Sequence, residues 1–285
     1  MSLPSPVKNY HTQPYAQIDP ASDRLSTKGK HVVISGAGSG IGAYIAEAFA
    51  KSGASSISLL GRTEKTLLAT KEKINTVYAD TKVLVFTADI SDESSLAKAF
   101  EGISSTIQAK LDVLIANAGY LPELAPVAKA NLTEWYQGFE INVKGNFNLV
   151  RAFLPYAAEK AAVINVSTGI THYQAPGYSG YHASKLAAVK IFDYLHQEHP
   201  DFFVLSVHPG VFLTEMGSKA KEQGIEFPLD DIELPAHFVV WAVSPEAQFL
   251  NGKFVWAHWD IDELTEMRQE IEGTNKFTMG LLGFP

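Results

Sequence analysis

Cysteine is absent from the 285 residues of this chain. Disulfide bonds, zinc–thiolate sites, iron–sulfur clusters and a thiol nucleophile are therefore excluded. Long apolar runs are absent too, since stretches such as 237–243 fall far short of the roughly 20 residues that span a bilayer. The N-terminal stretch MSLPSPVKNYHTQPYAQIDP lacks the apolar core of a secretory signal. We expect a soluble protein of the reducing cytoplasm that does not enter a membrane.

The chain has few positively charged residues: it contains 23 Lys and Arg and 31 Asp and Glu, which gives a net charge of −8. Nucleic-acid binding needs a basic face for phosphate contacts, so this balance argues against such a partner and leaves room only for a local phosphate pocket. His172, His182 and His208 include no pair with convincing metal spacing on one helix face, so no metal site is expected. We expect a small-molecule partner.

Short apolar runs alternate with segments of helical spacing along most of the chain. This alternation predicts right-handed βαβ units and a doubly wound parallel sheet, Rossmann-like, with helices on both faces of a single α/β domain. Strands are expected at residues 31–35, 56–61, 83–89, 112–119, 161–168, 202–210 and 252–259. Helices are expected at residues 41–51, 64–76, 94–107, 132–154, 181–199 and 263–272.

The two ends of the chain differ in texture from this middle part. Residues 1–28 are polar, rich in Pro, Ser and Tyr, and have no period. They are interpreted as an N-terminal extension that packs on the surface or on another subunit, although their composition fits a disordered tail equally well. Residues 29–258 carry the alternating pattern, and residues 259–285 read as a helix followed by an apolar tail.

A glycine-rich turn, SGAGSGIG, follows the first expected strand and leads directly into a helix. Glycine permits positive φ and lets the backbone approach a ligand closely. The helix N-terminus offers free N–H groups and a partial positive charge to a pyrophosphate. A plain turn would use the same glycines, but the position between strand and helix favours dinucleotide binding. The candidate residues are Gly36, Ser39, Gly40, Ile41 and Gly42.

The second expected strand ends at Gly61 and is followed by Arg62. An acidic residue at the position of Gly61 would bind the ribose hydroxyls of NAD. A guanidinium suits a 2′-phosphate instead, through charge-assisted and often bidentate hydrogen bonds. Arg62 therefore favours NADP(H) over NAD(H); the alternative is a solvated surface arginine.

Tyr181 and Lys185 lie four residues apart on an expected helix and so share one face. A phenol has an ordinary pKa of about 10, which a nearby ammonium lowers, so the pair can act as acid or base. Such a pair is common by chance, but Ser167 and Thr168 end the fifth strand just upstream. In an open α/β sheet ligands lie at this carboxyl edge, where a hydroxyl can bind a substrate carbonyl. The simpler interpretation is that both hydroxyls only cap the strand.

Taken together, these residues resemble the short-chain dehydrogenase/reductase family over about residues 29–258, with SGAGSGIG in place of its TGxxxGxG turn. The resemblance implies an NAD(P)-binding catalytic domain in which Tyr181 transfers the proton, Lys185 lowers its pKa and holds the nicotinamide ribose, and Thr168 positions the substrate oxygen. Thr168 stands where the family has Ser, with Ser167 as the alternative. Further matching positions are Asp89 with Ile90 near the adenine, Asn117, Ala118 and Gly119, Asn142 in the proton relay, and Pro209, Gly210, Val211 and Thr214 at the nicotinamide.

The substrate is expected to be a small lipophilic or aromatic ketone or alcohol. Side chains near the motifs in sequence would line its pocket: Ser167, Tyr173, Tyr178, Phe212 and Met216. The two chain ends resemble those of fungal members, many of which act on secondary metabolites, and the resemblance implies a homodimer or homotetramer. An alternative function is a cofactor-binding regulator or scaffold without redox turnover.

Overall fold

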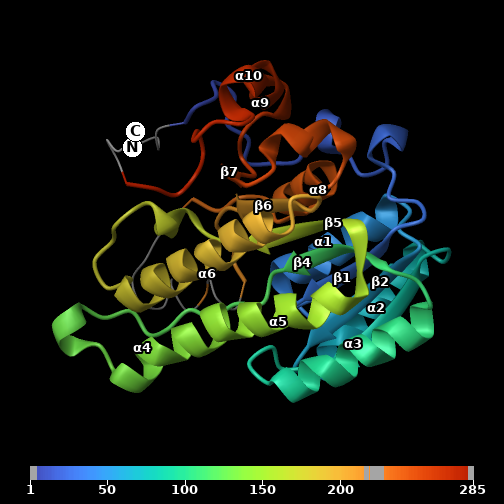
Figure 1. The fold of residues 1–285 in the computed structure, drawn as a ribbon, viewed down its shortest axis with the longest axis horizontal. Coiled ribbons are helices and arrows are strands. Elements are labelled where there is room, and N and C mark those ends of the chain that lie inside the picture. Colours follow the sequence, from blue (N-terminus) through green and yellow to red (C-terminus); the bar gives the residue numbers. More distant parts are fainter. Residues whose placement is uncertain (1–4, 215–217, 219–227, 282–285) are drawn as a thin grey trace.

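Seven strands form one sheet in this computed structural model, which describes residues 5–214, 218 and 228–281 (Figure 1). The strand order is β3-β2-β1-β4-β5-β6-β7 and every neighbouring pair is parallel. The strands are β1 His31–Ser35, β2 Ser56–Gly61, β3 Lys82–Thr87, β4 Leu111–Ala116, β5 Ala157–Val166, β6 Phe203–His208 and β7 Lys253–Trp256. The expected doubly wound α/β fold is confirmed.

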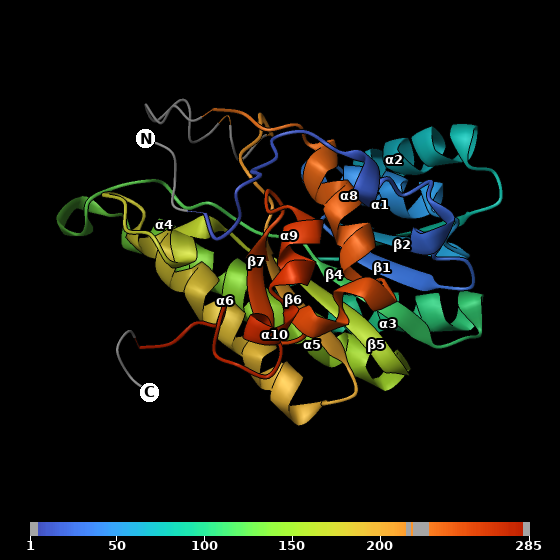
Figure 2. The same cartoon turned by 90° about the horizontal axis from the view of Figure 1, so that it is seen from above.

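Helices cover both faces of the sheet, and each face has its own apolar core (Figure 2). One face is packed by α1 Gly40–Lys51, α2 Glu64–Val77 and α8 Glu233–Ala242. The other is packed by α3 Glu93–Ile107, α5 Asn146–Phe153 and α6 Ser179–Glu198. Strands β1, β2, β4, β6 and β7 are almost wholly buried because both of their faces are covered, which explains their near-continuous apolar sequences, whereas only Val83 is buried in the edge strand β3.

The strand order reverses between β1 and β4, and ligands of open α/β sheets bind at such a point, outside the carboxyl ends. Several strands end before the sequence pattern does: β3 at Thr87, β4 at Ala116, β5 at Val166 and β6 at His208. The residues beyond these ends leave the sheet at its carboxyl edge. They include most of the predicted site residues.

The long helix expected at residues 132–154 is interrupted. The structure has α4 Leu132–Phe139, a π-helical stretch Glu140–Gly145 and then α5. π-Helical turns inside helices are frequent at functional sites, and this one contains Asn142. The helix expected at 263–272 is likewise two short helices, α9 Ile261–Glu266 and α10 Arg268–Ile271. Asp260 caps α9, since its Oδ1 accepts from the N–H groups of Asp262 and Glu263, each at 3.0 Å.

Helix α8 has no counterpart among the expected elements. Eight of its ten residues are buried, so its sequence lacks the one-sided apolar spacing that marks a surface helix. The N-terminal extension packs against the rest of the same chain, and its residues Ile18 and Leu25 are buried there. Among the described residues, no helix combines the length and apolar character needed to cross a bilayer.

Candidate active site

The glycine-rich turn adopts a backbone that only glycine accepts easily. Gly36 has φ +67° and Gly40 has φ +53°, in the left-handed region. A Cβ on Gly42 would lie 2.3 Å from the carbonyl oxygen of Gly36, so no side chain fits there. Ser39 is the N-cap of α1, yet its side chain makes no capping hydrogen bond. The first-turn N–H groups of α1 are therefore not capped by Ser39, which fits a pyrophosphate at this helix end.

Ser35 joins the ends of β1 and β4. Its Oγ accepts from the backbone N–H groups of Asn117 at 3.0 Å and Ala118 at 3.1 Å. The Nδ2 of Asn117 in turn donates to the carbonyls of Ser35 at 3.0 Å and Gly36 at 3.2 Å. The serine that replaces the usual threonine thus keeps the hydroxyl that the junction needs, and the predicted residues after β4 are held beside the glycine-rich turn.

The side chains predicted for the adenosine end lie at the ends of β2 and β3. Arg62 is exposed, directly after Gly61 at the end of β2. Asp89 faces its own turn, where its Oδ1 accepts from the Ser91 N–H at 2.9 Å and the Ser91 hydroxyl at 2.7 Å. Ile90 is buried, and a Cβ on Gly145 would lie 2.7 Å from its side chain.

Asn142 lies in the π-helical stretch and is fully buried. Its Oδ1 accepts from the Tyr120 N–H at 2.8 Å, and its Nδ2 donates to the Tyr120 carbonyl at 2.9 Å and to Ser184 Oγ at 3.0 Å. A Cβ on Gly119 would lie 3.4 Å from Asn142 Oδ1 and 3.7 Å from Lys185 Nζ. The hydrogen bonds of Asn142 therefore hold the backbone at Tyr120, just after β4, close to Lys185. Tyr120 and Ser184 were not among the predicted site residues, although Ser184 directly precedes Lys185.

Tyr181, Lys185 and Thr168 meet at the carboxyl edge. The side chains of Tyr181 and Thr168 share a hydrogen bond. Lys185 is 4% exposed and its Nζ donates to the Val166 carbonyl, the last residue of β5, at 2.8 Å. Burial lowers the pKa of Lys185 to about 8. A buried lysine with a depressed pKa, one helical turn from a tyrosine on the same helix, is an arrangement suited to proton transfer.

The pKa of Tyr181 differs from the sequence-based expectation. Burial raises this pKa above that of a free phenol; the hydrogen bond with Thr168 lowers it and the neighbouring Tyr178 raises it further. The expected lowering by Lys185 is wrong for the protein alone. The main cause is the loss of solvent around the phenol, which disfavours the charged phenolate.

Ser167 and Thr168 differ sharply in surroundings. Ser167 is 4% exposed, and within the part of the chain that the structure describes its Oγ has no hydrogen-bond partner. Thr168 Oγ1 bonds Tyr181 and accepts from the Ile170 N–H at 3.3 Å. The geometry brings Thr168, and not Ser167, to the tyrosine hydroxyl.

The segment after β6 reaches back to the glycine-rich turn. The Thr214 methyl lies 3.2 Å from the position that a Cβ on Gly40 would take. Gly210 has φ +116°, and a Cβ there would lie 2.9 Å from the Phe212 ring. The residues after β6 therefore contact both the glycine-rich turn, through Thr214, and the predicted pocket residue Phe212, through Gly210. Met216, which was also predicted for the pocket, lies outside the described residues.

The predicted pocket residues are mostly buried. Tyr178 and Phe212 are 8% and 6% exposed, respectively. Tyr173 is half-buried and packs edge-on against Trp256, with ring centroids 5.8 Å apart. Aromatic and apolar side chains thus surround this part of the carboxyl edge.

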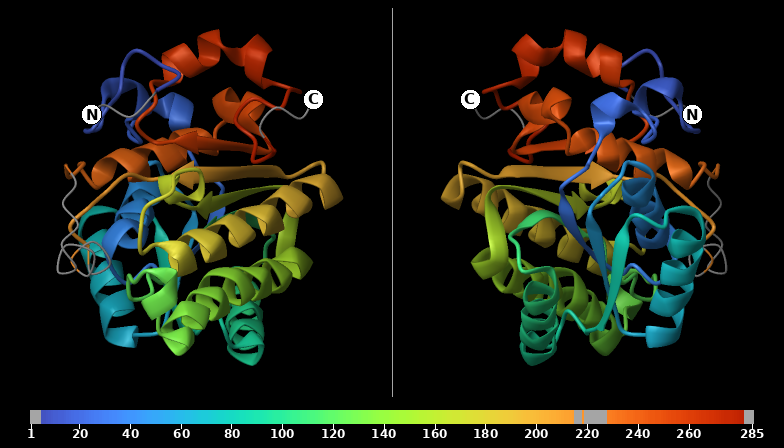
Figure 3. Two further views of the ribbon diagram at one scale, coloured as in Figure 1. Left: turned by 90° about the vertical axis from the view of Figure 1, so that its left-hand side faces the viewer. Right: turned by 90° about the vertical axis from the view of Figure 1, so that its right-hand side faces the viewer.

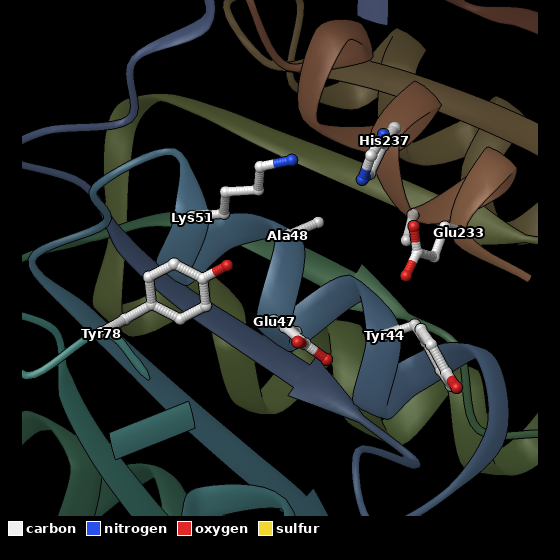
Figure 4. A pocket seen from close by; sticks show the side chains of 8 residues that line it. Tyr44, Glu47, Ala48, Lys51, Tyr78, Glu233 and His237 are labelled. Carbon is white, nitrogen blue, oxygen red and sulfur yellow. The ribbon is translucent and has the colours of Figure 1, made fainter. Parts of the chain in front are cut away.

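A separate hollow lies between α1 and α8 (Figure 4). None of its lining residues belongs to the predicted site, and they mix acidic, basic and phenolic groups without a common chemistry. They are Tyr44, Glu47, Ala48, Lys51, Tyr78, Glu233, Ala236 and His237. Burial is the main reason that the pKa of His237 falls to about 4.

Comparison with known proteins gives consistent results. A family model described as short chain dehydrogenase matches residues 30–224. A short chain dehydrogenase/reductase of Claviceps purpurea is 34% identical over 99% of this chain and 96% of its own length. The short chain dehydrogenase/reductase AacuD of Aspergillus aculeatus is 32% identical over 97% and 96%. A Shigella flexneri short chain dehydrogenase, solved in complex with NADP, has a TM-score of 0.76 at 24% identity, covering 83% of this chain and 99% of its own.

Proposed function

The chain belongs to the short-chain dehydrogenase/reductase family of NAD(P)-dependent oxidoreductases, and from that membership we propose that it interconverts a ketone and a secondary alcohol of a small lipophilic substrate with NADP(H). The observation that carries the proposal is the hydrogen bond between Tyr181 and Thr168 at the edge of the sheet where the buried Lys185 donates to the Val166 carbonyl. Lipophilic substrates are supported by the apolar setting of Tyr178, Phe212 and Tyr173.

The chemistry divides between cofactor and protein. The nicotinamide, when bound, supplies or accepts the hydride. In the direction of reduction, Tyr181 Oη gives its proton to the substrate oxygen, and in oxidation it takes that proton back. Thr168 orients the same oxygen through its hydroxyl. Lys185 supplies positive charge near the phenol. Gly119, in the chain after β4, lies close to both Lys185 Nζ and Asn142 Oδ1.

The cofactor would lie along the carboxyl edge, from the end of β3 to the segment after β6. Its pyrophosphate suits the uncapped first turn of α1 with Gly36, Ser39, Gly40, Ile41 and Gly42. Its other proposed contacts are Asp89, Ile90 and Arg62 at the adenosine end, Asn117, Ala118 and Gly119 in the middle, and Lys185, Pro209, Gly210, Val211 and Thr214 at the nicotinamide end.

Replacing Arg62 with Ala tests the cofactor preference. The exposed guanidinium at the end of β2 would bind the 2′-phosphate, so its loss is expected to weaken NADPH binding roughly tenfold or more. NADH affinity should stay the same, because NADH has no 2′-phosphate. Fluorescence titration of both cofactors measures the two affinities. Equal affinities of the unaltered protein for NADPH and NADH would refute this assignment.

Thr168→Ala and Ser167→Ala distinguish the two hydroxyls. Loss of the Thr168 hydroxyl removes a hydrogen bond to Tyr181 and is expected to lower kcat about 100-fold or more. Loss of the Ser167 hydroxyl removes a buried group without a partner in the described part of the chain, so its effect should be far smaller. Initial rates with saturating NADPH provide the comparison. The opposite ranking would assign the role to Ser167.

The activity itself is tested by incubating the protein with NADPH and a panel of aliphatic and aromatic ketones, following absorbance at 340 nm. Turnover of at least one ketone class is expected. Bound NADPH with no turnover on any of them would favour a cofactor-binding regulator without redox activity.

We also propose that the protein is cytoplasmic and forms a homodimer or homotetramer. The oligomer is supported by exposed apolar side chains on α4 and α5, at Leu132, Tyr136 and Phe147, because such side chains often mark protein interfaces.

A further inference from the structure

Three segments that are far apart in sequence meet beside the chain that follows β6. They are residues 10–12, 230–231 and 258–259. The His11 N–H donates to the His258 carbonyl, and the Asp231 N–H donates to the Thr12 carbonyl, both at 2.8 Å. The N-terminal extension thus forms backbone hydrogen bonds with both of the other segments. Figure 3 shows this extension beside α9 and α10 at one end of the molecule.

Asp230 connects this junction to the predicted nicotinamide-binding segment. Its Oδ2 accepts from the Val211 N–H at 2.8 Å and lies 3.0 Å from His258 Nε2. The Asp230 N–H in turn donates to the Val211 carbonyl at 2.9 Å. The side chains of His258 and Asp230 are 3% and 9% exposed, so water competes little with these bonds. The place of Val211 is therefore set by Asp230.

Gly210 shows how close this contact is. A Cβ on Gly210 would lie 2.7 Å from Asp230 Oδ2 and 3.1 Å from His258 Nε2. The backbone of residues 209–211 consequently lies directly against the Asp230–His258 pair. Any shift of His258 would move a carboxylate that touches this backbone.

The ring of Tyr10 packs against the imidazole of His258. The two rings stack with centroids 4.6 Å apart and an interplanar angle of 12°. Tyr10 also packs edge-on against Trp256 at 6.5 Å. His258 Nδ1 is buried and has no hydrogen-bond partner among residues 5–214, 218 and 228–281. The orientation of the imidazole therefore depends on Asp230 and on its ring contacts, of which the Tyr10 stack is the closest to parallel.

We propose that Tyr10 is a positioning residue of the active site: by way of His258 and Asp230 it holds the backbone of residues 209–211 where the nicotinamide end of the cofactor binds. The inference rests on the proposed function, since it needs that segment to contact the cofactor. It gives the N-terminal extension a role in cofactor binding, although Tyr10 lies 220 residues from Asp230 in sequence. Tyr10 itself touches neither the cofactor nor the reacting atoms.

The test uses full-length protein and two probes, NADPH and adenosine 2′,5′-bisphosphate, which lacks the nicotinamide half. Tyr10→Ala is expected to weaken NADPH binding roughly 3- to 10-fold, the value of one aromatic pair, and to leave the bisphosphate affinity unchanged. Tyr10→Phe keeps the stacked ring and should restore most of the NADPH affinity. Asp230→Ala should also weaken NADPH selectively, and adding Tyr10→Ala to it should cause little further loss, because both act through one connection.

Tyr194→Ala is the matched control, since Tyr194 is a 63% exposed tyrosine on α6 outside this junction, and it should bind both probes normally. If Tyr10→Ala fails to fold, Tyr10→Leu replaces it, because Leu keeps apolar bulk without a stacking ring. NADPH affinity equal to that of the unaltered protein, equal loss of both probes, or full additivity with Asp230→Ala would each overturn the inference. Failure of the unaltered protein to bind either probe would instead overturn the proposed function.

Discussion

Tyr181→Phe is expected to lower kcat by about 10²- to 10⁴-fold while leaving NADPH affinity nearly unchanged. The substitution removes one oxygen, and with it the hydrogen bond to Thr168 and the only proton that the phenol can give to a substrate oxygen. The aromatic ring stays, so the packing of the surrounding side chains changes little. Stopped-flow measurement of NADPH oxidation with the best ketone of the panel gives the rate of the chemical step.

Tyr178→Phe is the matched control for that variant. Tyr178 is a buried tyrosine whose charge interaction with Tyr181 raises the pKa of the latter. Removing its hydroxyl should therefore change kcat far less than removing that of Tyr181. Full activity in Tyr181→Phe would rule out the proton-transfer role of this tyrosine, and equal losses in both variants would point to general damage of the pocket.

Lys185→Met is expected to abolish measurable turnover and at the same time to stabilise the fold. The pKa of Lys185 falls from 10.5 to about 8 because burial disfavours the ammonium. Each unit of this shift corresponds to roughly 1.4 kcal/mol, so the buried charge costs about 3 kcal/mol at neutral pH. Methionine has similar length and no charge, and it gives up only the hydrogen bond to the Val166 carbonyl. We expect a net gain of about 1–2 kcal/mol in unfolding free energy at pH 7.

The pH dependence of this gain has a defined sign. Between pH 8 and 10.5 the unfolded chain binds more protons at Lys185 than the folded protein, so the stability contribution of this residue rises with pH. The advantage of Lys185→Met should therefore be full below pH 8 and shrink above it. Urea unfolding at pH 7, 8.5 and 9.5 measures the trend. Lys190→Met, at a half-exposed lysine on the same helix, should show no comparable advantage at any of these pH values.

The fold followed from the sequence because its signals are local. Each strand of a two-face-covered parallel sheet is an apolar run, and each amphipathic helix repeats its apolar residues along one stripe. The predictions were wrong for two elements that lack such a local signal. Helix α8 is buried on nearly all sides, so it has no stripe, and the π-helical stretch Glu140–Gly145 has the same helical spacing as its neighbours.

The sequence by itself determined the family, the glycine-rich turn and the pair Tyr181 and Lys185, because these depend on residue types at short fixed spacings. Only the tertiary structure decided that Thr168 meets the tyrosine hydroxyl while Ser167 is buried apart from it, since neighbouring residues on a strand end point in different directions. Only the tertiary structure shows that burial raises the pKa of Tyr181, and that Tyr10 reaches His258 across most of the chain. Desolvation and long-range contacts arise from the packing of distant segments, and no local pattern in the sequence records them.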